Sequence, residues 1–207
     1  RVHMHKQLSQ FPYRFGKTII VLFGLTIILL FGPVISTGTH TTQFRLEKEL
    51  IGHKDIILTV AWSPDGKTLA SGSRESELII WNTTNGHIIK NITGEPSDGL
   101  ICNEIDSVAW SPDGSKLAVS SYNGTFQIWD ASLNNILLSV VGIFNNVVSS
   151  VSWSPDGTKL AASYFDATIK IWTVPEGKMI GNWTGHTKEV TSVKWSAAGA
   201  PTITATA

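Results

Sequence analysis

Three stretches of the chain are nearly identical: VAWSPDGKTLASGS begins at Val60, VAWSPDGSKLAVSS at Val108 and VSWSPDGTKLAASY at Val151. A fourth and more divergent copy, VKWSAAGAPTITAT, begins at Val193. The leading tryptophans of the four copies are 48, 43 and 42 residues apart. Self-similarity at a nearly fixed period indicates a repeat architecture, so the fold is set by the structure of one unit.

Each complete unit contains four segments with the alternation of polar and apolar residues that a half-buried β-strand requires. In the first unit these segments are residues 57–62, 68–73, 77–81 and 87–92. Pro64-Asp65-Gly66 suits a tight turn, because proline presets φ and glycine takes the left-handed position. Asn85-Gly86 is a strong hairpin signal. We therefore predict an all-β protein, a β-propeller fragment of about three and a half four-stranded blades.

Two dipeptide elements recur beside these repeats. Gly52-His53 and Gly185-His186 precede repeat units, and Trp129-Asp130 ends the third strand of the second unit. With them, residues 44–207 resemble the WD-repeat β-propeller family, with units at about 52–94, 95–142 and 143–185 and a truncated unit at 186–207. The resemblance implies a non-enzymatic scaffold that binds other proteins. Since family members have about seven blades, we expect more sequence beyond residue 207.

The resemblance also implies a structural set of four hydrogen-bonded side chains in a blade: a histidine, a serine or threonine, an aspartate and a tryptophan. In the family, the serine lies ten residues before the third-strand tryptophan, and the acid lies six residues before it. At these positions the first unit has His53, Ser71, Glu75 and Trp81 as its four members. Glutamate replaces aspartate in this set. The other two units lack the histidine; they place Val119, Asn123 and Trp129, and Ala162, Asp166 and Trp172, at the remaining positions.

A second set of candidate residues lies seven positions before each third-strand tryptophan. Arg74, Tyr122 and Phe165 occupy this place, in the turn between the second and third strands. In the family this turn opens on the face that meets partners, and arginine and aromatic side chains supply most interface energy. We predict that these three residues, called the partner surface below, form one contiguous patch, to which Tyr164 would add. The alternative is that Phe165 folds back over the edge of its blade.

An apolar segment precedes the repeats. No Asp, Glu, Lys or Arg occurs from Thr18 to Phe44, and residues 18–38 are long enough to cross a bilayer as a helix. Residues 1–17 form a basic tail and residues 39–43 a linker. We predict a hydrophobic helix that acts as a transmembrane anchor, with a cytoplasmic N-terminus and an exported propeller. The alternatives are a signal peptide cleaved near Thr37, which gives a secreted protein, and a buried helix of a soluble protein. Most members of the family are cytosolic, so a cytosolic propeller is a further alternative.

Composition and motifs exclude several functions. The chain has 16 basic and 16 acidic residues, and the part after residue 17 carries a net charge of −4, which argues against nucleic acid as a partner. The single cysteine, Cys102, allows no internal disulfide, and the six histidines lack metal-ligand spacing. The repeated Asp65, Asp113 and Asp156 are explained by their turns. We predict no catalytic residue, metal or cofactor.

The favoured hypothesis is a membrane-tethered protein–protein interaction scaffold. The alternative is the sensor or scaffold half of a larger signalling protein with an upstream catalytic domain, such as a kinase. An exported propeller enzyme would need acids or histidines that converge on the central loops. Export would make four Asn-x-Thr sequons candidate glycosylation sites: Asn82, Asn91, Asn123 and Asn182. The loop 95–104, which accounts for the longest repeat spacing, is predicted to protrude either as a tolerated insertion or as a binding loop.

Overall fold

A computed structural model describes residues 18–21, 26–31, 45–94, 104–142, 146–196 and 203–206. Its regular secondary structure within these residues consists of strands β1 to β17, with no helix. The predicted all-β fold is confirmed. The predicted protrusion of loop 95–104, and Cys102 with it, lies outside the described residues except for Glu104.

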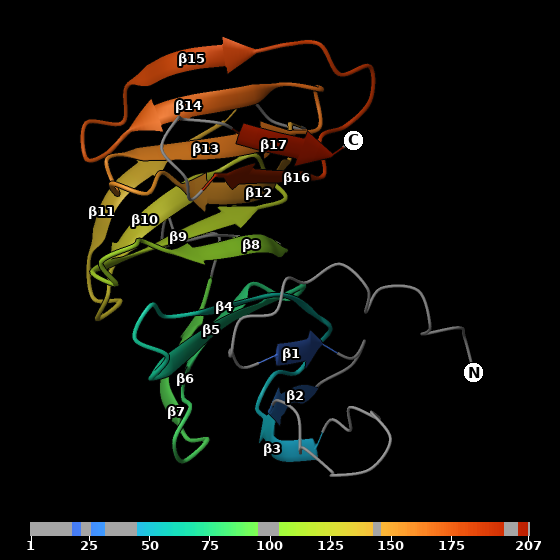
Figure 1. The fold of residues 1–207 in the computed structure, drawn as a ribbon, viewed down its shortest axis with the longest axis vertical. Helices are drawn as coiled ribbons and strands as arrows, with labels where there is room; N and C mark the ends of the chain where they lie inside the picture. Colours follow the sequence, from blue (N-terminus) through green and yellow to red (C-terminus); the bar gives the residue numbers. More distant parts are fainter. Residues whose placement is uncertain are drawn as a thin grey trace, which may run out of the picture.

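Three four-stranded antiparallel sheets follow one another along the chain and form three blades (Figure 1). Blade 1 is β4 (Ile57–Trp62), β5 (Thr68–Ser73), β6 (Glu77–Asn82) and β7 (Ile88–Thr93). Blade 2 is β8 (Ile105–Trp110), β9 (Lys116–Ser121), β10 (Phe126–Asp130) and β11 (Ile136–Val140). Blade 3 is β12 (Val148–Trp153), β13 (Lys159–Tyr164), β14 (Ile169–Thr173) and β15 (Met179–Trp183). β16 (Ser192–Trp195) and β17 (Ile203–Thr206) form a two-stranded partial blade.

The Pro-Asp-Gly turn between the first and second strands, here called the first turn, has the same geometry in each blade. In blade 1 the Ser63 hydroxyl donates to Asp65 Oδ1 over 2.7 Å, and Gly66 has a φ of 69°. Asp113 and Asp156 accept from the matching serines over 2.6 Å each. These bonds, with those from nearby backbone N–H groups, lower the pKa of all three carboxyls, that of Asp156 to about 2. The three aspartates therefore serve as turn-capping acceptors.

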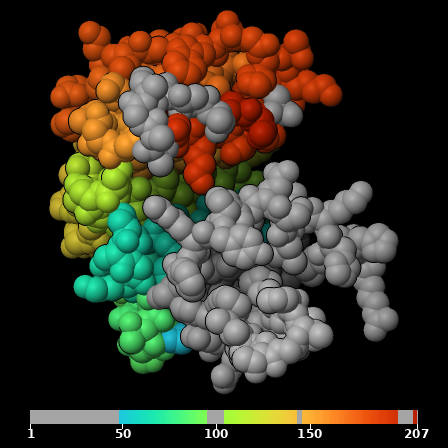
Figure 2. Space-filling model, viewed as in Figure 1, coloured from blue at the N-terminus to red at the C-terminus, as the bar shows by residue number. Residues whose placement is uncertain are grey.

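The blades pack face to face through apolar layers, and they appear as successive bands from blue-green through lime to orange in Figure 2. Between blades 1 and 2 the buried cluster includes Leu78, Ile80, Leu117 and Trp129. The cluster between blades 2 and 3 is built in the same way, from Phe126, Ile128, Val148, Val151, Trp153, Leu160 and their neighbours. Backbone N–H groups of one innermost strand also bond to hydroxyls of the preceding one, as Val108 N does to Thr59 Oγ1 at 3.2 Å. This packing fixes each blade against the next.

The apolar N-terminal segment differs from the prediction. Within the predicted helix 18–38, the described residues form β1 (Thr18–Val21) and β2 (Thr26–Phe31), which join β3 (Arg45–Ile51) in the order β1-β2-β3. The segment is rich in β-branched Ile, Val and Thr, which favour strands, and β3 supplies backbone partners. None of the described residues lies in a helix long and apolar enough to cross a membrane.

Candidate functional site

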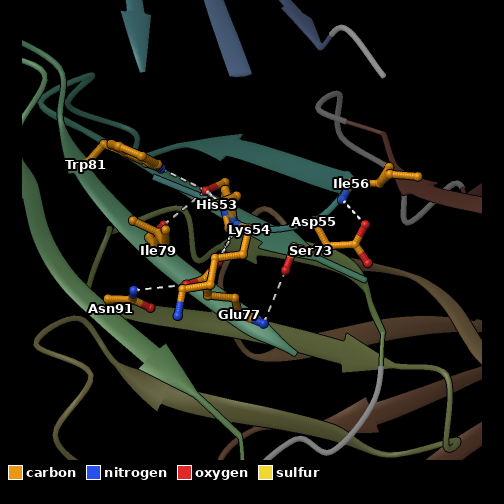
Figure 3. Close-up of polar contacts among 10 residues, drawn as sticks. His53, Lys54, Asp55, Ile56, Ser73, Glu77, Ile79, Trp81 and Asn91 are labelled. Carbon is orange, nitrogen blue, oxygen red and sulfur yellow. Dashed lines mark hydrogen bonds and ion pairs between the residues drawn. The ribbon is translucent and has the colours of Figure 1, made fainter. Parts of the chain in front are cut away.

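Four buried side chains of blade 1 and the segment before it form a hydrogen-bonded chain (Figure 3). Trp81 Nε1 donates to Ser71 Oγ at 2.8 Å, and Ser71 Oγ lies 2.6 Å from His53 Nε2. His53 Nδ1 lies 3.1 Å from Glu77 Oε2. β5 supplies the serine, β6 supplies the tryptophan and the glutamate, and the segment that leads into β4 supplies the histidine. The structure thus joins three of the four residues expected from the sequence.

The acid of this set is Glu77, and the expectation of Glu75 is wrong. Glu75 is exposed and Glu77 is buried. The Glu77 carboxylate accepts two further bonds, from Lys54 N at 3.2 Å and from Asn91 Nδ2 at 3.1 Å. Asn91, on the outermost strand of the blade, is thus a member of the network that the sequence did not reveal.

Strand geometry explains why Glu77 takes this role. Residues 77, 79 and 81 alternate onto one face of β6, and the register pairs Ser71 with Ile79. Within β6, which begins at Glu77, an acid on this face lies two or four residues before the tryptophan, whereas Glu75 lies in the turn before the strand. Period-two counting from Trp81 reaches both Glu77 and Glu75, and only Glu77 belongs to the strand.

The protonation state of His53 follows from its surroundings. Burial lowers the pKa of His53, and the nearby Glu77 carboxylate opposes that shift. A neutral His53 ring donates from Nδ1 to Glu77 and accepts at Nε2 from the Ser71 hydroxyl. With this assignment, every polar group of the network has a hydrogen-bond partner. The Ser71 oxygen remains free to accept from Trp81.

This hydrogen-bonded network contains the residue types of a Ser-His-acid catalytic triad. Unlike a catalytic triad, it is not accessible to a substrate. Ser71 has no exposed surface, and its hydroxyl already bridges His53 and Trp81. A nucleophile needs an open approach for its substrate. The hydrogen bonds of this network can therefore hold together β5, β6 and the segment before β4 that carries His53. The buried network offers no position for a reacting group.

Blades 2 and 3 use the corresponding turn positions differently. Asn123 Oδ1 accepts from Ser121 Oγ and from Thr125 N, so it caps its own turn. Asp166 does the same through Thr168 N at 3.0 Å. Trp129 Nε1 is buried and has no hydrogen-bond partner within the described part of the chain. These blades rely on packing where blade 1 has a network.

The partner-surface residues occupy equivalent places in the turn between the second and third strands, here called the second turn. Arg74, Tyr122 and Phe165 each donate a backbone N–H to a carbonyl in the segment that leads into their own blade, over 3.0, 3.0 and 3.1 Å. Tyr122 is 52% exposed and Phe165 is 42% exposed, so Phe165 is not folded away under the blade edge. Tyr164 is buried and does not join this surface.

Arg74 is already engaged within its own blade. Its Nε and one terminal nitrogen donate to the two oxygens of Asp55, each over 3.0 Å. These bonds to Asp55 raise the pKa of the Arg74 guanidinium. The Arg74 side chain is nevertheless half-exposed, so a partner would meet an oriented Arg74–Asp55 pair.

The candidate glycosylation sites differ in their local engagement. Asn82 Oδ1 caps a turn by accepting from Thr84 N and Asn85 N, while Asn123 caps the second turn of blade 2. Asn91 donates to buried Glu77, and Asn182 is exposed on β15. Among the residues that the structure describes, no group of three or more His, Cys, Asp or Glu is arranged to hold a metal ion.

Comparison with known proteins defines the class. The model of the WD domain, G-beta repeat, matches residues 44–82 and 86–130, and that of the anaphase-promoting complex subunit 4 WD40 domain matches residues 144–198. These ranges together span more than half of the chain. The chain belongs to the WD40-repeat family, whose members are generally non-enzymatic scaffolds that bind other proteins.

Individual relatives share single stretches with this chain. Ribosomal RNA-processing protein 9 of Saccharomyces cerevisiae is 49% identical over 43 residues, 21% of this chain and 8% of that protein. WD repeat protein iqw1 of Schizosaccharomyces pombe is 40% identical over 52 residues, 25% of this chain and 6% of that protein. The chain thus spans less than a tenth of either relative.

Solved structures support the fold. The crystal structure of RRP9 WD40 repeats superposes with a TM-score of 0.66 at 23% identity, over 70% of this chain and 43% of that one. The structure of U3-55K gives the same score and identity, over 70% of this chain and 44% of that one. At this identity the likeness shows a shared propeller architecture.

Proposed function

We propose that the chain is a protein-interaction scaffold whose partner surface is Arg74, Tyr122 and Phe165. One observation carries this proposal: three successive blades present a large side chain, exposed by half or nearly so, at the same position of the same turn. Arginine, tyrosine and other large aromatics are the residues that dominate binding energy once a partner excludes water from them. Loops held on a rigid sheet scaffold are the usual site of recognition.

The triple variant Arg74→Ala/Tyr122→Ala/Phe165→Ala tests the proposal. We expect it to fold and to lose about tenfold or more of its affinity for a partner captured with the wild-type protein. Affinity is to be measured with purified proteins by calorimetry. The matched control is Ile89→Ala/Leu137→Ala/Ile180→Ala, which removes comparably exposed apolar side chains from the outermost strands. Wild-type affinity of the partner-surface variant would refute the proposal.

We further propose that His53, Ser71, Glu77 and Trp81 have a structural role and no catalytic role. Their burial and mutual saturation support this. The same reasoning applies to Asp65, Asp113 and Asp156, whose carboxylates accept hydrogen bonds within their own turns.

Membrane tethering through residues 18–38 remains a proposal that rests on the sequence. Its support is the long run without charged residues and the basic tail before it. A bilayer helix would be incompatible with the pairing of β1 and β2 to β3, so the two arrangements exclude each other.

Extraction of membranes at alkaline pH tests the tether. We expect the expressed chain to stay in the membrane pellet and a variant lacking residues 18–38 to move to the supernatant. An intact wild-type chain in the supernatant would contradict the tether. Release of a chain that begins near Thr37 would instead establish the secreted alternative.

A further inference from the structure

The second turn of blade 3, which carries Phe165, is held from two sides by side-chain hydrogen bonds. Asn146, in the segment that leads into β12, accepts from Asp166 N at 3.1 Å and donates from Nδ2 to Asp166 Oδ2 at 2.7 Å. Lys170, on β14, donates from Nζ to the same carboxylate oxygen at 3.3 Å. The residue that directly follows Phe165 is thus bound to two other elements of the blade. Asn146, Asp166 and Lys170 are called the turn clamp below.

Backbone hydrogen bonds hold the same turn. Phe165 N donates to Val147 O at 3.1 Å. Tyr164, which precedes Phe165, donates its backbone N–H to Thr168 O at 3.0 Å, and its carbonyl accepts from Val190 N at 3.2 Å. The main chain on both sides of Phe165 is therefore fixed, while the Phe165 side chain stays exposed.

Lys170 lies at an interior position of its blade. The register that pairs it with β13 places Ile79 at the same point of β6 and Gln127 at the same point of β10. Blade 3 is therefore the one complete blade with a charged side chain at this place. The Lys170 side chain is 18% exposed, and a largely buried ammonium needs a counter-charge.

The surroundings of the Lys170 ammonium tie it to the turn. Its nitrogen lies 4.0 Å from the centroid of the buried Tyr164 ring and 3.3 Å from Asp166 Oδ2. A cation–π attraction and a charge-assisted hydrogen bond thus hold it in place. Burial acts to raise the pKa of Asp166, but the bonds from Thr168 and Asn146 and the charge of Lys170 lower this pKa overall. Asp166 is therefore an ionised acceptor at neutral pH.

The second turns of the other two blades are held differently. In blade 1 the partner-surface residue is itself bound, because Arg74 donates to both oxygens of Asp55. In blade 2 the described side-chain bonds stay within the turn, where Asn123 accepts them; residue 103, two before β8, lies outside the described residues. In blade 3 the bonds go to the residue after Phe165, which leaves the aromatic side chain available to a partner.

We propose that the turn clamp positions Phe165 for partner binding: Asn146 and Lys170 act through Asp166 to fix the main chain from which Phe165 projects. Phe165 is then the pre-organised anchor of the partner surface. Ordering a loop or a side chain at an interface costs affinity, so a turn that is already ordered in the free protein binds more tightly. The clamp residues are positioning residues and do not need to touch the partner. This inference rests on the proposed function.

NMR relaxation of the free protein tests the first step. We expect the backbone amide of Phe165 to have an order parameter of about 0.85, the value of rigid backbone. Asn146→Ala removes two bonds at the surface and Lys170→Met keeps the aliphatic stem; each should lower the order parameter, and the double variant should bring it to about 0.6. The matched control is Lys159→Met, since Lys159 pairs with Asp156 in the first turn of the same blade, and it should leave the value unchanged. Unchanged order in both single clamp variants overturns the proposal.

A double-mutant cycle tests whether the turn clamp acts through Phe165. The probe is the purified partner protein captured with the wild-type chain, and its affinity is measured by calorimetry. We expect Asn146→Ala and Lys170→Met each to weaken binding about threefold to tenfold. In the Phe165→Ala background each should change affinity by less than about twofold, because the side chain that the clamp positions is gone. Equal losses in both backgrounds, as a purely structural clamp would give, overturn the proposal.

The same cycle separates this inference from the proposed function. If Phe165→Ala keeps wild-type affinity, the assignment of Phe165 to the partner surface fails. If Phe165→Ala weakens binding and the clamp variants weaken it independently, the partner surface stands and the positioning role fails.

Discussion

Replacing Glu77 with alanine is expected to lower the free energy of unfolding by about 3 kcal/mol. The carboxylate accepts from Lys54 N and Asn91 Nδ2 and partners His53 Nδ1, so its removal leaves buried donors without an acceptor. A buried network is strongly stabilising only when every member is satisfied. Chemical denaturation followed by tryptophan fluorescence measures the change.

Glu75→Ala is the matched control for this experiment. Glu75 is the acid that the family spacing selects, but it is exposed, and we expect its removal to cost less than about 0.5 kcal/mol. If Glu75→Ala destabilised the protein as much as Glu77→Ala, the network described for blade 1 would be wrong. Unchanged affinity of a folded Glu77→Ala variant for a captured partner would agree with its structural role.

Substitution of Gly72 by alanine is expected to cost about 3 kcal/mol, through overpacking between blades 1 and 2. A Cβ at this position would lie 2.3 Å from Ile105 Cγ2 and 2.9 Å from Thr59 Cγ2. Neither neighbour can withdraw easily, because both belong to paired innermost strands. Thermal unfolding of the variant measures the cost.

Two further variants separate overpacking from a general loss of glycine. Gly66 has a φ of 69° and nothing within 4 Å of an added Cβ, so Gly66→Ala should cost only about 1 kcal/mol of backbone strain. The double variant Gly72→Ala/Ile105→Leu removes the crowding Cγ2 methyl group from the β-carbon, and it should be less destabilised than Gly72→Ala/Ile105→Val, which keeps a methyl group at that place. Equal stability of the Gly72→Ala and Gly66→Ala variants would contradict the close approach of the blades.

The blades could be predicted because their signals are local. Each Pro-Asp-Gly turn fixes a strand reversal within four residues, and Gly66 takes the left-handed conformation expected of it. Repetition then multiplies a signal that would be weak in a single copy. The second turns were predictable for the same reason, and they expose Tyr122 and Phe165 as expected.

The features that were missed depend on contacts that spacing does not encode. Glu75 was chosen by counting along the chain, whereas membership of the network depends on where β6 begins: Glu77 is its first residue, and Glu75 lies in the turn before it. The register shift near the start of β8 becomes visible only when β8 is paired with β9. The apolar segment was expected to be a helix, because a long apolar run does not distinguish a helix from two strands that find a partner in β3.

Site-specific photo-crosslinking tests most directly which edge of the blades meets partners. A benzophenone amino acid would replace Tyr122 or Phe165 in the second turns, or Thr84 or Asn134 in the turns at the opposite ends of blades 1 and 2. All four residues are exposed, so each probe can contact a partner. We predict that positions 122 and 165 crosslink to one and the same partner, and that positions 84 and 134 do not. Crosslinks from positions 84 and 134, with none from 122 and 165, would contradict the assigned partner surface.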